Sequence, residues 1–138
     1  DEDIQAIVSD EALDSAEYYR LLFLKVCSET GETPMATVKI LDDGIEKEGK
    51  AEGGGPVDAA FRAIESIAKS ESELQLYSVN NITSGTDAQG EVTVRLQKDG
   101  RIVNGQGADT DIVVASAKAY IGALNKLKSG AERLNPQL

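Results

Sequence analysis

The chain matches itself at an offset of 56 residues, and this internal repeat limits its possible folds more than any other feature of the sequence. Residues 37–40, Thr-Val-Lys-Ile, align with residues 93–96, Thr-Val-Arg-Leu, and the Asp-Gly pair at 43–44 aligns with the pair at 99–100. A period near 50 residues is typical of a duplicated structural unit. We therefore expect two copies of one unit.

Each copy begins with three predicted strands. In the second strand of the first copy, Ala36, Val38 and Ile40 alternate with polar residues, which is typical of a sheet with one buried face. In the strand before it, Leu22 and Leu24 are expected to face the core by the same alternation. Each Asp-Gly pair favours a tight hairpin, because both residues tolerate positive φ. The expected strands are 19–29, 35–41 and 45–51 in the first copy and 74–83, 91–97 and 101–107 in the second.

A helix is predicted after each third strand. Pro56 suits the first position of the first helix, because the N–H that proline lacks has no partner there. The second helix has three candidate N-cap residues at 109–111, and Gly130 is the residue expected just beyond its end. Apolar residues recur at three- and four-residue spacing in both segments, which gives each helix one buried face. The predicted fold class is α+β, with two pseudo-repeated β-β-β-α units whose sheets pack against helices.

The repeat also sets the expected domain organisation. One domain should cover 18–128, with unit one at 18–70 and unit two at 71–128. Apolar residues spaced among acids suggest that 1–17 are a linker-derived helical segment, and 129–138 are expected to form a loose tail.

Composition excludes several partners. The formal net charge of -10 argues against nucleic acid and against anionic membrane surfaces, since both require clustered Lys and Arg. No apolar run approaches the roughly 20 residues of a membrane span, and the acidic start is unlike a signal peptide. The single cysteine, Cys27, cannot form an intrachain disulfide, and a cytoplasmic location is expected. Cys27 follows the apolar run 21–26 and is expected in the core.

The chain contains no histidine, which removes the commonest general base and the commonest transition-metal ligand. One cysteine without histidine cannot build a zinc site of the usual kind. The sequence has no P-loop, no G-x-S-x-G and no dinucleotide-binding glycine motif. We therefore expect no catalytic residue, no metal ligand and no cofactor in this chain.

Two segments could bind a ligand. The glycines at 53–55 precede Pro56, and they either make a tight strand-to-helix turn or let a helix start approach an anion such as a carboxylate. Residues 80–88 are polar and turn-prone, and they are expected to form a long hairpin loop with or without a binding role. Tyr77 lies just before this loop and could belong to the core or to a pocket.

Three ordered motifs, at 53–61, 77–92 and 105–120, resemble the C-terminal regulatory domain of 2-isopropylmalate synthase. The resemblance covers roughly 18–128, and the start of the chain, at 3–8, looks like the end of the linker that precedes that domain. Members of this family are acyltransferases that condense acetyl-CoA with 2-oxoisovalerate in leucine biosynthesis. Their reaction takes place on a divalent-metal-dependent barrel in a separate catalytic domain.

For this chain the resemblance implies a feedback module that forms a homodimer and binds leucine near the dimer interface. It implies that apolar side chains hold the isobutyl group, helix-start N–H groups meet the carboxylate, and Asp58 meets the ammonium. The effector-binding residues that it implies are Gly53, Gly55, Asp58, Leu74, Tyr77, Asn81, Ala88 and Ile112.

Two alternatives stay open. The related citramalate synthase shares this domain and senses isoleucine, and one methyl position separates the two ligands by only about 1–3 kcal/mol. The chain could also be a structural dimerisation module without a ligand. An independent enzyme is disfavoured by the missing histidine and the missing catalytic motifs.

Overall fold

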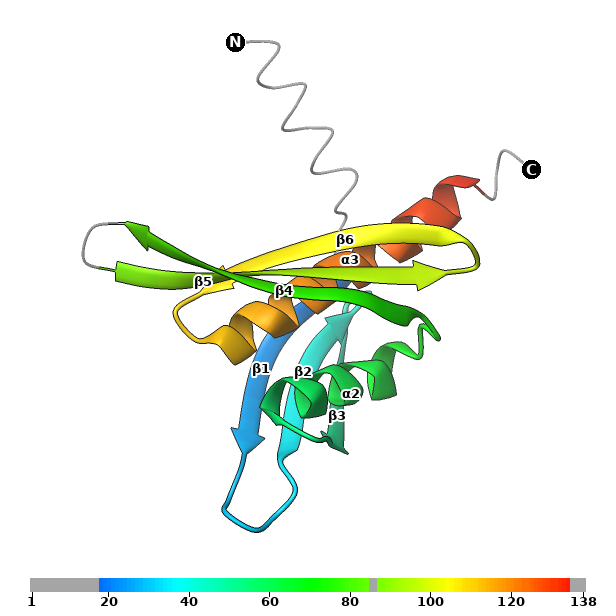
Figure 1. Ribbon diagram of the computed structural model, residues 1–138. Coiled ribbons are helices and arrows are strands. Elements are labelled where there is room, and N and C mark those ends of the chain that lie inside the picture. Colours follow the sequence, from blue (N-terminus) through cyan, green and yellow to red (C-terminus); the bar gives the residue numbers. More distant parts are fainter. Residues whose placement is uncertain (1–17, 85–86, 135–138) are drawn as a thin grey trace.

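The structure is a computed structural model that describes residues 18–84 and 87–134, with side chains at 18–80 and 89–128. Over these ranges the chain forms two antiparallel three-stranded sheets, each with its strands in chain order, and two helices (Figure 1). This arrangement confirms the α+β prediction of two β-β-β-α units. Unit one contains β1 (Tyr19–Cys27), β2 (Met35–Asp42), β3 (Ile45–Glu52) and α2 (Pro56–Ala68). Unit two contains β4 (Glu73–Ser84), β5 (Asp87–Lys98), β6 (Arg101–Asp109) and α3 (Ile112–Leu134).

The Asp-Gly hairpins confirm that the sequence repeat is a structural repeat. Asp43 and Asp99 have φ angles of 54° and 52°, and the glycines that follow them have φ angles of 87° and 80°. Positive φ at both central residues is the geometry of the two-residue turn that matches the twist of paired strands.

The two sheets place their apolar faces against the helices. α2 packs on β2 and β3, α3 packs on β5 and β6, and the two helices also contact each other. α3 additionally reaches β1, so it connects the second unit to the first. The fully buried strand residues alternate along β2 and β5, as the sequence pattern predicts; they are Ala36, Val38, Ile40, Val92, Val94 and Leu96.

Equivalent glycines bring each helix close to its sheet. A Cβ atom on Gly49 would lie 2.6 Å from the carbonyl oxygen of Ala63 in α2. A Cβ atom on Gly105 would meet the carbonyl oxygen of Ala119 in α3, and both of these residues lie 56 positions after their counterparts. The repeated glycines therefore have the same role in both units, which is to let a helix backbone lie directly on the third strand.

We expect Gly105→Ala to destabilise the domain by about 1–3 kcal/mol, because the new methyl group would push α3 off β6. Urea unfolding should show this as a lower midpoint with an unchanged slope. Gly122→Ala is the matched control, since the nearest heavy atom to its Cβ would be 3.8 Å away and alanine favours a helix interior. Equal stability of the two variants would contradict this assignment.

Three local predictions are wrong. Residues 80–88 do not form a long loop, because β4 continues to Ser84 and β5 begins at Asp87, with 85–86 outside the described residues. Polar Asn and Thr residues can support such a two-stranded extension, because backbone hydrogen bonds hold it together. The extension projects beyond the start of α3 (Figure 1). The helix end predicted at Gly130 is also absent: α3 runs on to Leu134, since one glycine costs only about 1 kcal/mol in a helix.

The third error concerns β1. Cys27 is exposed rather than in the core, because it pairs with Met35 on the face that points away from the helices. Leu22 is 46% exposed because the register shifts between Leu21 and Phe23, which makes Leu22 the extra residue of a β-bulge. A bulge changes which residues face the core, and alternation alone does not reveal it. The first strand of unit two has the same irregularity, between Leu74 and Leu76.

Candidate functional site

The start of α2 is an exposed helix N-terminus without a side-chain cap. Gly55 is the N-cap residue, with an extended φ of -158°, and its carbonyl accepts the Ala59 N–H at 2.9 Å. Pro56 occupies the first helical turn, as predicted. Gly53 is buried against that turn, since a Cβ there would lie 2.5 Å from the Ala59 nitrogen. The glycines therefore bring the loop close to the helix and leave the first N–H groups of α2 uncovered by any side chain.

Asp58 fixes the shape of this glycine loop. Its Oδ2 accepts the Gly54 N–H at 2.9 Å and the Arg62 Nε–H at 3.0 Å. The Gly54 N–H is the main cause that holds the pKa of the Asp58 carboxyl below its usual range, and the hydrogen bond from Arg62 adds to it. The other oxygen, Oδ1, accepts no hydrogen bond from a residue that the structure describes. Asp58 thus stays ionised and keeps one carboxylate oxygen for an incoming cation.

The depressed pKa of Asp58 makes the stability of the loop pH-dependent. A carboxyl whose pKa is lowered by folding stabilises the protein above its unfolded pKa, and this contribution is lost as pH falls through the folded pKa. We expect wild type to be more stable than Asp58→Asn near about pH 6, and the two curves to converge near about pH 2. Urea midpoints across this range test the prediction, and parallel curves would contradict it.

The start of α3 differs from that of α2. Asp111 is its N-cap: Oδ1 of Asp111 accepts the Val113 N–H at 2.8 Å, and its carbonyl accepts the Ala115 N–H at 2.9 Å. Asp109 supports this cap by accepting the Asp111 N–H at 3.0 Å and by pairing with Lys118. The predicted cap at 109–111 is confirmed. A carboxylate already satisfies the α3 start, so of the two helix starts in the described residues only that of α2 is suited to an external anion.

Tyr77 joins three elements. Its hydroxyl lies 2.8 Å from Ser116 Oγ in α3, and its ring makes a T-shaped contact with the Phe61 ring of α2 at a centroid distance of 5.9 Å. Ser116 in turn donates to the carbonyl of Ile112 at 2.7 Å. The hydroxyl is bonded while the residue as a whole remains 36% exposed, so Tyr77 lies at the edge of the core and can contact a ligand as well.

Tyr77 belongs to an apolar stripe on β4, formed by Leu74, Tyr77 and Val79. These side chains share the helix-facing side of the sheet, since they pair with the buried Leu96, Val94 and Val92 of β5. They are nevertheless 47%, 36% and 40% exposed, because neither helix extends over β4 in the described chain. Apolar side chains that face inward and yet stay uncovered are typical of a surface that a partner covers.

The structure brings only some of the predicted residues together. Ile112 begins α3 and packs against Gly90, where a Cβ would meet its Cδ1 atom. Ile112 is also connected to Tyr77 through Ser116. Gly53, Gly55 and Asp58 form a second group, which is linked to Tyr77 through Phe61 in the same helix. Leu74 contacts neither group through a described interaction. The side chains of Asn81 and Ala88 lie outside the described residues, although their backbones pair with Gly90 and Thr83.

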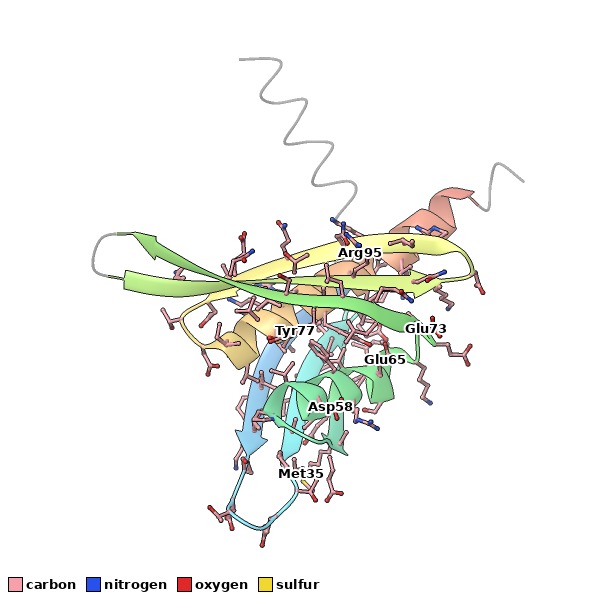
Figure 2. The ribbon with its side chains drawn as sticks, viewed as in Figure 1. Met35, Asp58, Glu65, Glu73, Tyr77 and Arg95 are labelled. Atoms are coloured by element: carbon pink, nitrogen blue, oxygen red, sulfur yellow. The ribbon has the colours of Figure 1, made fainter. Side chains whose placement is uncertain are left out.

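A polar cluster between the two units was not predicted from the sequence. Glu65, whose place on α2 is labelled in Figure 2, accepts the Tyr120 hydroxyl of α3 at 2.6 Å. It also accepts the Ser70 N–H at 3.0 Å and the Ser70 hydroxyl at 2.6 Å. Burial, followed by the Glu65 carboxylate, raises the pKa of Tyr120 far above its usual range. Tyr120 is therefore a permanent donor. A buried tyrosine needs such a partner, but the sequence does not reveal which residue supplies it.

No three His, Cys, Asp or Glu side chains among the described residues converge on a metal position. Neither helix in the described ranges has the length and apolar character needed to cross a membrane. A duplicated α+β unit with one open helix start and an uncovered apolar stripe defines a class of ligand-binding and association domains.

The comparisons with known proteins agree with that class. The family model of the LeuA allosteric (dimerisation) domain matches residues 1–128, and the chain belongs to this family. It is similar to "2-isopropylmalate synthase" of Thiobacillus denitrificans (66% identity over 139 residues), of Nitrosomonas europaea (67% over 138) and of Methylococcus capsulatus (59% over 139). Each match covers 100% of this chain and 27% of the relative, so the chain spans about a quarter of the length of these curated relatives.

Proposed function

We propose that this chain is the leucine-binding feedback and dimerisation domain of a 2-isopropylmalate synthase. The single observation that carries the proposal is the inequality of the two helix starts. α3 is capped by its own Asp111, whereas α2 begins at a glycine loop without a side-chain cap, in the helix whose Phe61 contacts Tyr77. Membership of an allosteric domain family and the names of the relatives support an effector role and this parent enzyme.

The proposed binding mode follows from the groups on either side of α2. The leucine carboxylate would accept the free N–H groups of the first turn, which the partial positive charge of a helix start favours. Its ammonium would meet Oδ1 of Asp58, which is ionised and has no described donor. Its isobutyl group would pack on apolar side chains such as Tyr77 and Ile112. The ligand thus needs both charges and a branched tail, which matches a branched-chain amino acid.

A second copy of the chain is proposed to cover the apolar stripe on β4. The stripe contains the predicted effector residues Leu74 and Tyr77, so covering it would also enclose the isobutyl group and shield it from water. The family is described as a dimerisation domain, which supports a homodimer.

The acyl transfer from acetyl-CoA to 2-oxoisovalerate, and the divalent metal that supports it, are proposed to belong to another part of the longer cytoplasmic protein. The described part of this chain contains no cluster of side chains that fits such a metal.

Titration calorimetry with leucine, isoleucine and valine tests the proposal. We expect leucine to bind and isoleucine to bind roughly 10-fold to 200-fold more weakly, because the two differ in one methyl position. Tighter binding of isoleucine would favour the citramalate synthase alternative. An absence of heat with all three ligands, on a folded dimer, would leave only the structural dimerisation module.

A further inference from the structure

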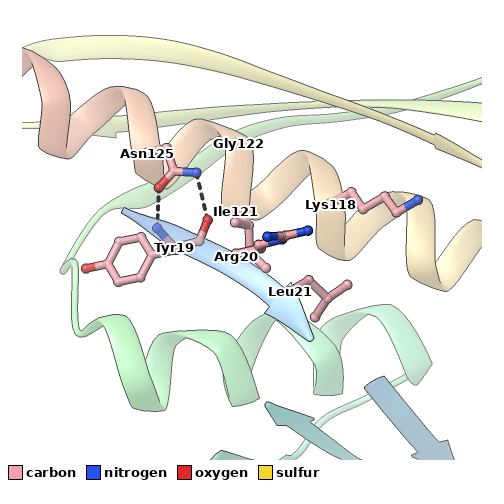
Figure 3. A pocket seen from close by; sticks show the side chains of 7 residues that line it. All are labelled: Tyr19, Arg20, Leu21, Lys118, Ile121, Gly122 and Asn125. Carbon is pink, nitrogen blue, oxygen red and sulfur yellow. Dashed lines mark hydrogen bonds between the residues drawn. The ribbon is translucent and has the colours of Figure 1, made fainter. Parts of the chain in front are cut away.

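Asn125 of α3 binds the backbone of the first strand of the other unit. Its Oδ1 accepts the Tyr19 N–H at 2.7 Å, and its Nδ2 donates to the Tyr19 carbonyl at 3.0 Å (Figure 3). The asparagine is only 5% exposed. Together the two hydrogen bonds reproduce the pair that a neighbouring strand would make, so Asn125 closes the free edge of β1 at its first residue.

Lys128, which lies about one helical turn further along α3, contacts the same region at the start of β1. Its Nζ lies 5.0 Å from the centroid of the Tyr19 ring and 5.1 Å from that of Tyr18, and it lies 3.8 Å from Oδ1 of Asp42. Tyr18 and Tyr19 are the residues through which the preceding segment, 1–17, joins the domain. The C-terminal half of α3 therefore fixes the position at which the chain enters this domain.

The N-terminal half of the same helix contacts the candidate effector site, through the Tyr77–Ser116 hydrogen bond. Ser116 and Asn125 are nine positions apart in one uninterrupted helix, which corresponds to about 14 Å along the axis. Because a helix moves largely as a rigid body, a shift at Ser116 moves Asn125 as well. The contacts at the two ends of α3 are thereby connected mechanically.

The contact between α3 and β1 has room to change. A surface pocket of about 340 Å³, open to solvent, lies between the edge of β1 and α3, directly beside Asn125. It is lined by Tyr19, Arg20, Leu21, Lys118, Ile121, Gly122 and Asn125 (Figure 3). Close-packed interiors resist small displacements, whereas no side chain fills the outer side of this junction, so β1 can take a second arrangement against the helix. The space beside Asn125 thus permits the strand to shift when α3 shifts.

We propose that Asn125 is a positioning residue that couples effector binding at Tyr77 and Ser116 to the segment that enters the domain at Tyr19. This proposal rests on the proposed function, because it assigns the regulation of that same site. The effector changes the position of α3, and the paired hydrogen bonds of Asn125 carry that change to the start of β1. Because the amide makes both of its hydrogen bonds to the backbone of one residue, a displacement of Asn125 acts on Tyr19 at two atoms.

The test uses the longer protein with Asn125→Asp, which preserves the size of the side chain but sets a carboxylate oxygen against the Tyr19 carbonyl. We expect leucine affinity to stay within about threefold of wild type and the inhibition reached at saturating leucine to fall about tenfold or more. Asn104→Ala is the control: its side chain accepts one hydrogen bond from Arg95 inside unit two, and the variant should be inhibited like wild type. Unchanged inhibition in a folded Asn125→Asp variant would overturn the proposal.

A second measurement needs no ligand, and it separates failure of this coupling from failure of leucine binding. Hydrogen exchange at the Tyr19 amide should be slow in wild type and at least about tenfold faster in Asn125→Asp. Ser116→Ala, which removes the contact with Tyr77, should change Tyr19 exchange in the wild-type background and leave it unchanged in Asn125→Asp. If the rate of hydrogen exchange at the Tyr19 amide is the same in Ser116→Ala as in wild type, the coupling is overturned, whether or not leucine binds.

Discussion

Replacing Gly55 with aspartate is expected to stabilise the domain by about 0.5–1 kcal/mol and to weaken leucine binding by about 100-fold or more. The stabilisation arises because aspartate would cap α2 in the way that Asp111 caps α3. The loss of binding arises because the new carboxylate would occupy the N–H groups proposed for the ligand carboxylate and would repel it. One substitution thus changes stability and affinity in opposite directions.

The backbone geometry of Gly55 allows a side chain to be introduced there without strain. Its φ of -158° is extended backbone that any residue adopts, and a Cβ there would meet no heavy atom within 4 Å. Gly55→Ala is therefore the matched control, with a new side chain but no cap and no charge, and its leucine affinity should stay within about threefold of wild type. Calorimetry and urea unfolding of both variants give the two readouts. Wild-type affinity in Gly55→Asp would show that the leucine carboxylate does not sit at the α2 start.

Local patterns in the sequence predict most of the fold, because their causes are local. The Asp-Gly turns, the start of α2 at Pro56 and the cap of α3 at Asp111 each depend on residues within one turn of the chain. The repeat extends the Asp-Gly turn to the second unit, whereas the two helix starts differ between the units. Where a single residue breaks the pattern, as Leu22 does at the bulge in β1, the alternation no longer tells which residues are buried.

The contacts between the units could not be predicted in this way. The hydrogen bonds of Asn125 with Tyr19 span 106 positions, and that of Tyr120 with Glu65 spans 55. Helical periodicity identifies the apolar face of α3, and it gives no partner for a polar residue on that face. The resemblance predicted Tyr77 and Ile112 near each other, but Ser116, which connects them, has no signal in the sequence. Pairings across a domain depend on tertiary packing, which a single sequence does not encode in any local pattern.

Glu65→Ala is expected to destabilise the domain by about 3 kcal/mol or more, because it removes a carboxylate that accepts three hydrogen bonds and leaves the buried Tyr120 hydroxyl without its acceptor. Tyr120→Phe removes only one of these bonds and should cost about 1–2 kcal/mol. Urea unfolding of both variants gives the two values. Glu73→Ala is the control, since Glu73 accepts one exposed hydrogen bond from Gln75 and should change stability by less than about 0.5 kcal/mol.

The double variant Glu65→Ala/Tyr120→Phe measures the interaction energy between Glu65 and Tyr120. Once Glu65 is gone, the tyrosine hydroxyl has lost its carboxylate acceptor, so removing the hydroxyl as well should recover about 1–2 kcal/mol relative to the sum of the single effects. Strict additivity would mean that the carboxylate and the hydroxyl do not interact in solution. Because Glu65 belongs to unit one and Tyr120 to unit two, a coupling of this size acts between the repeats themselves. It would make them unfold as one cooperative body, and a rigid connection of this kind is what a signal passing along α3 requires.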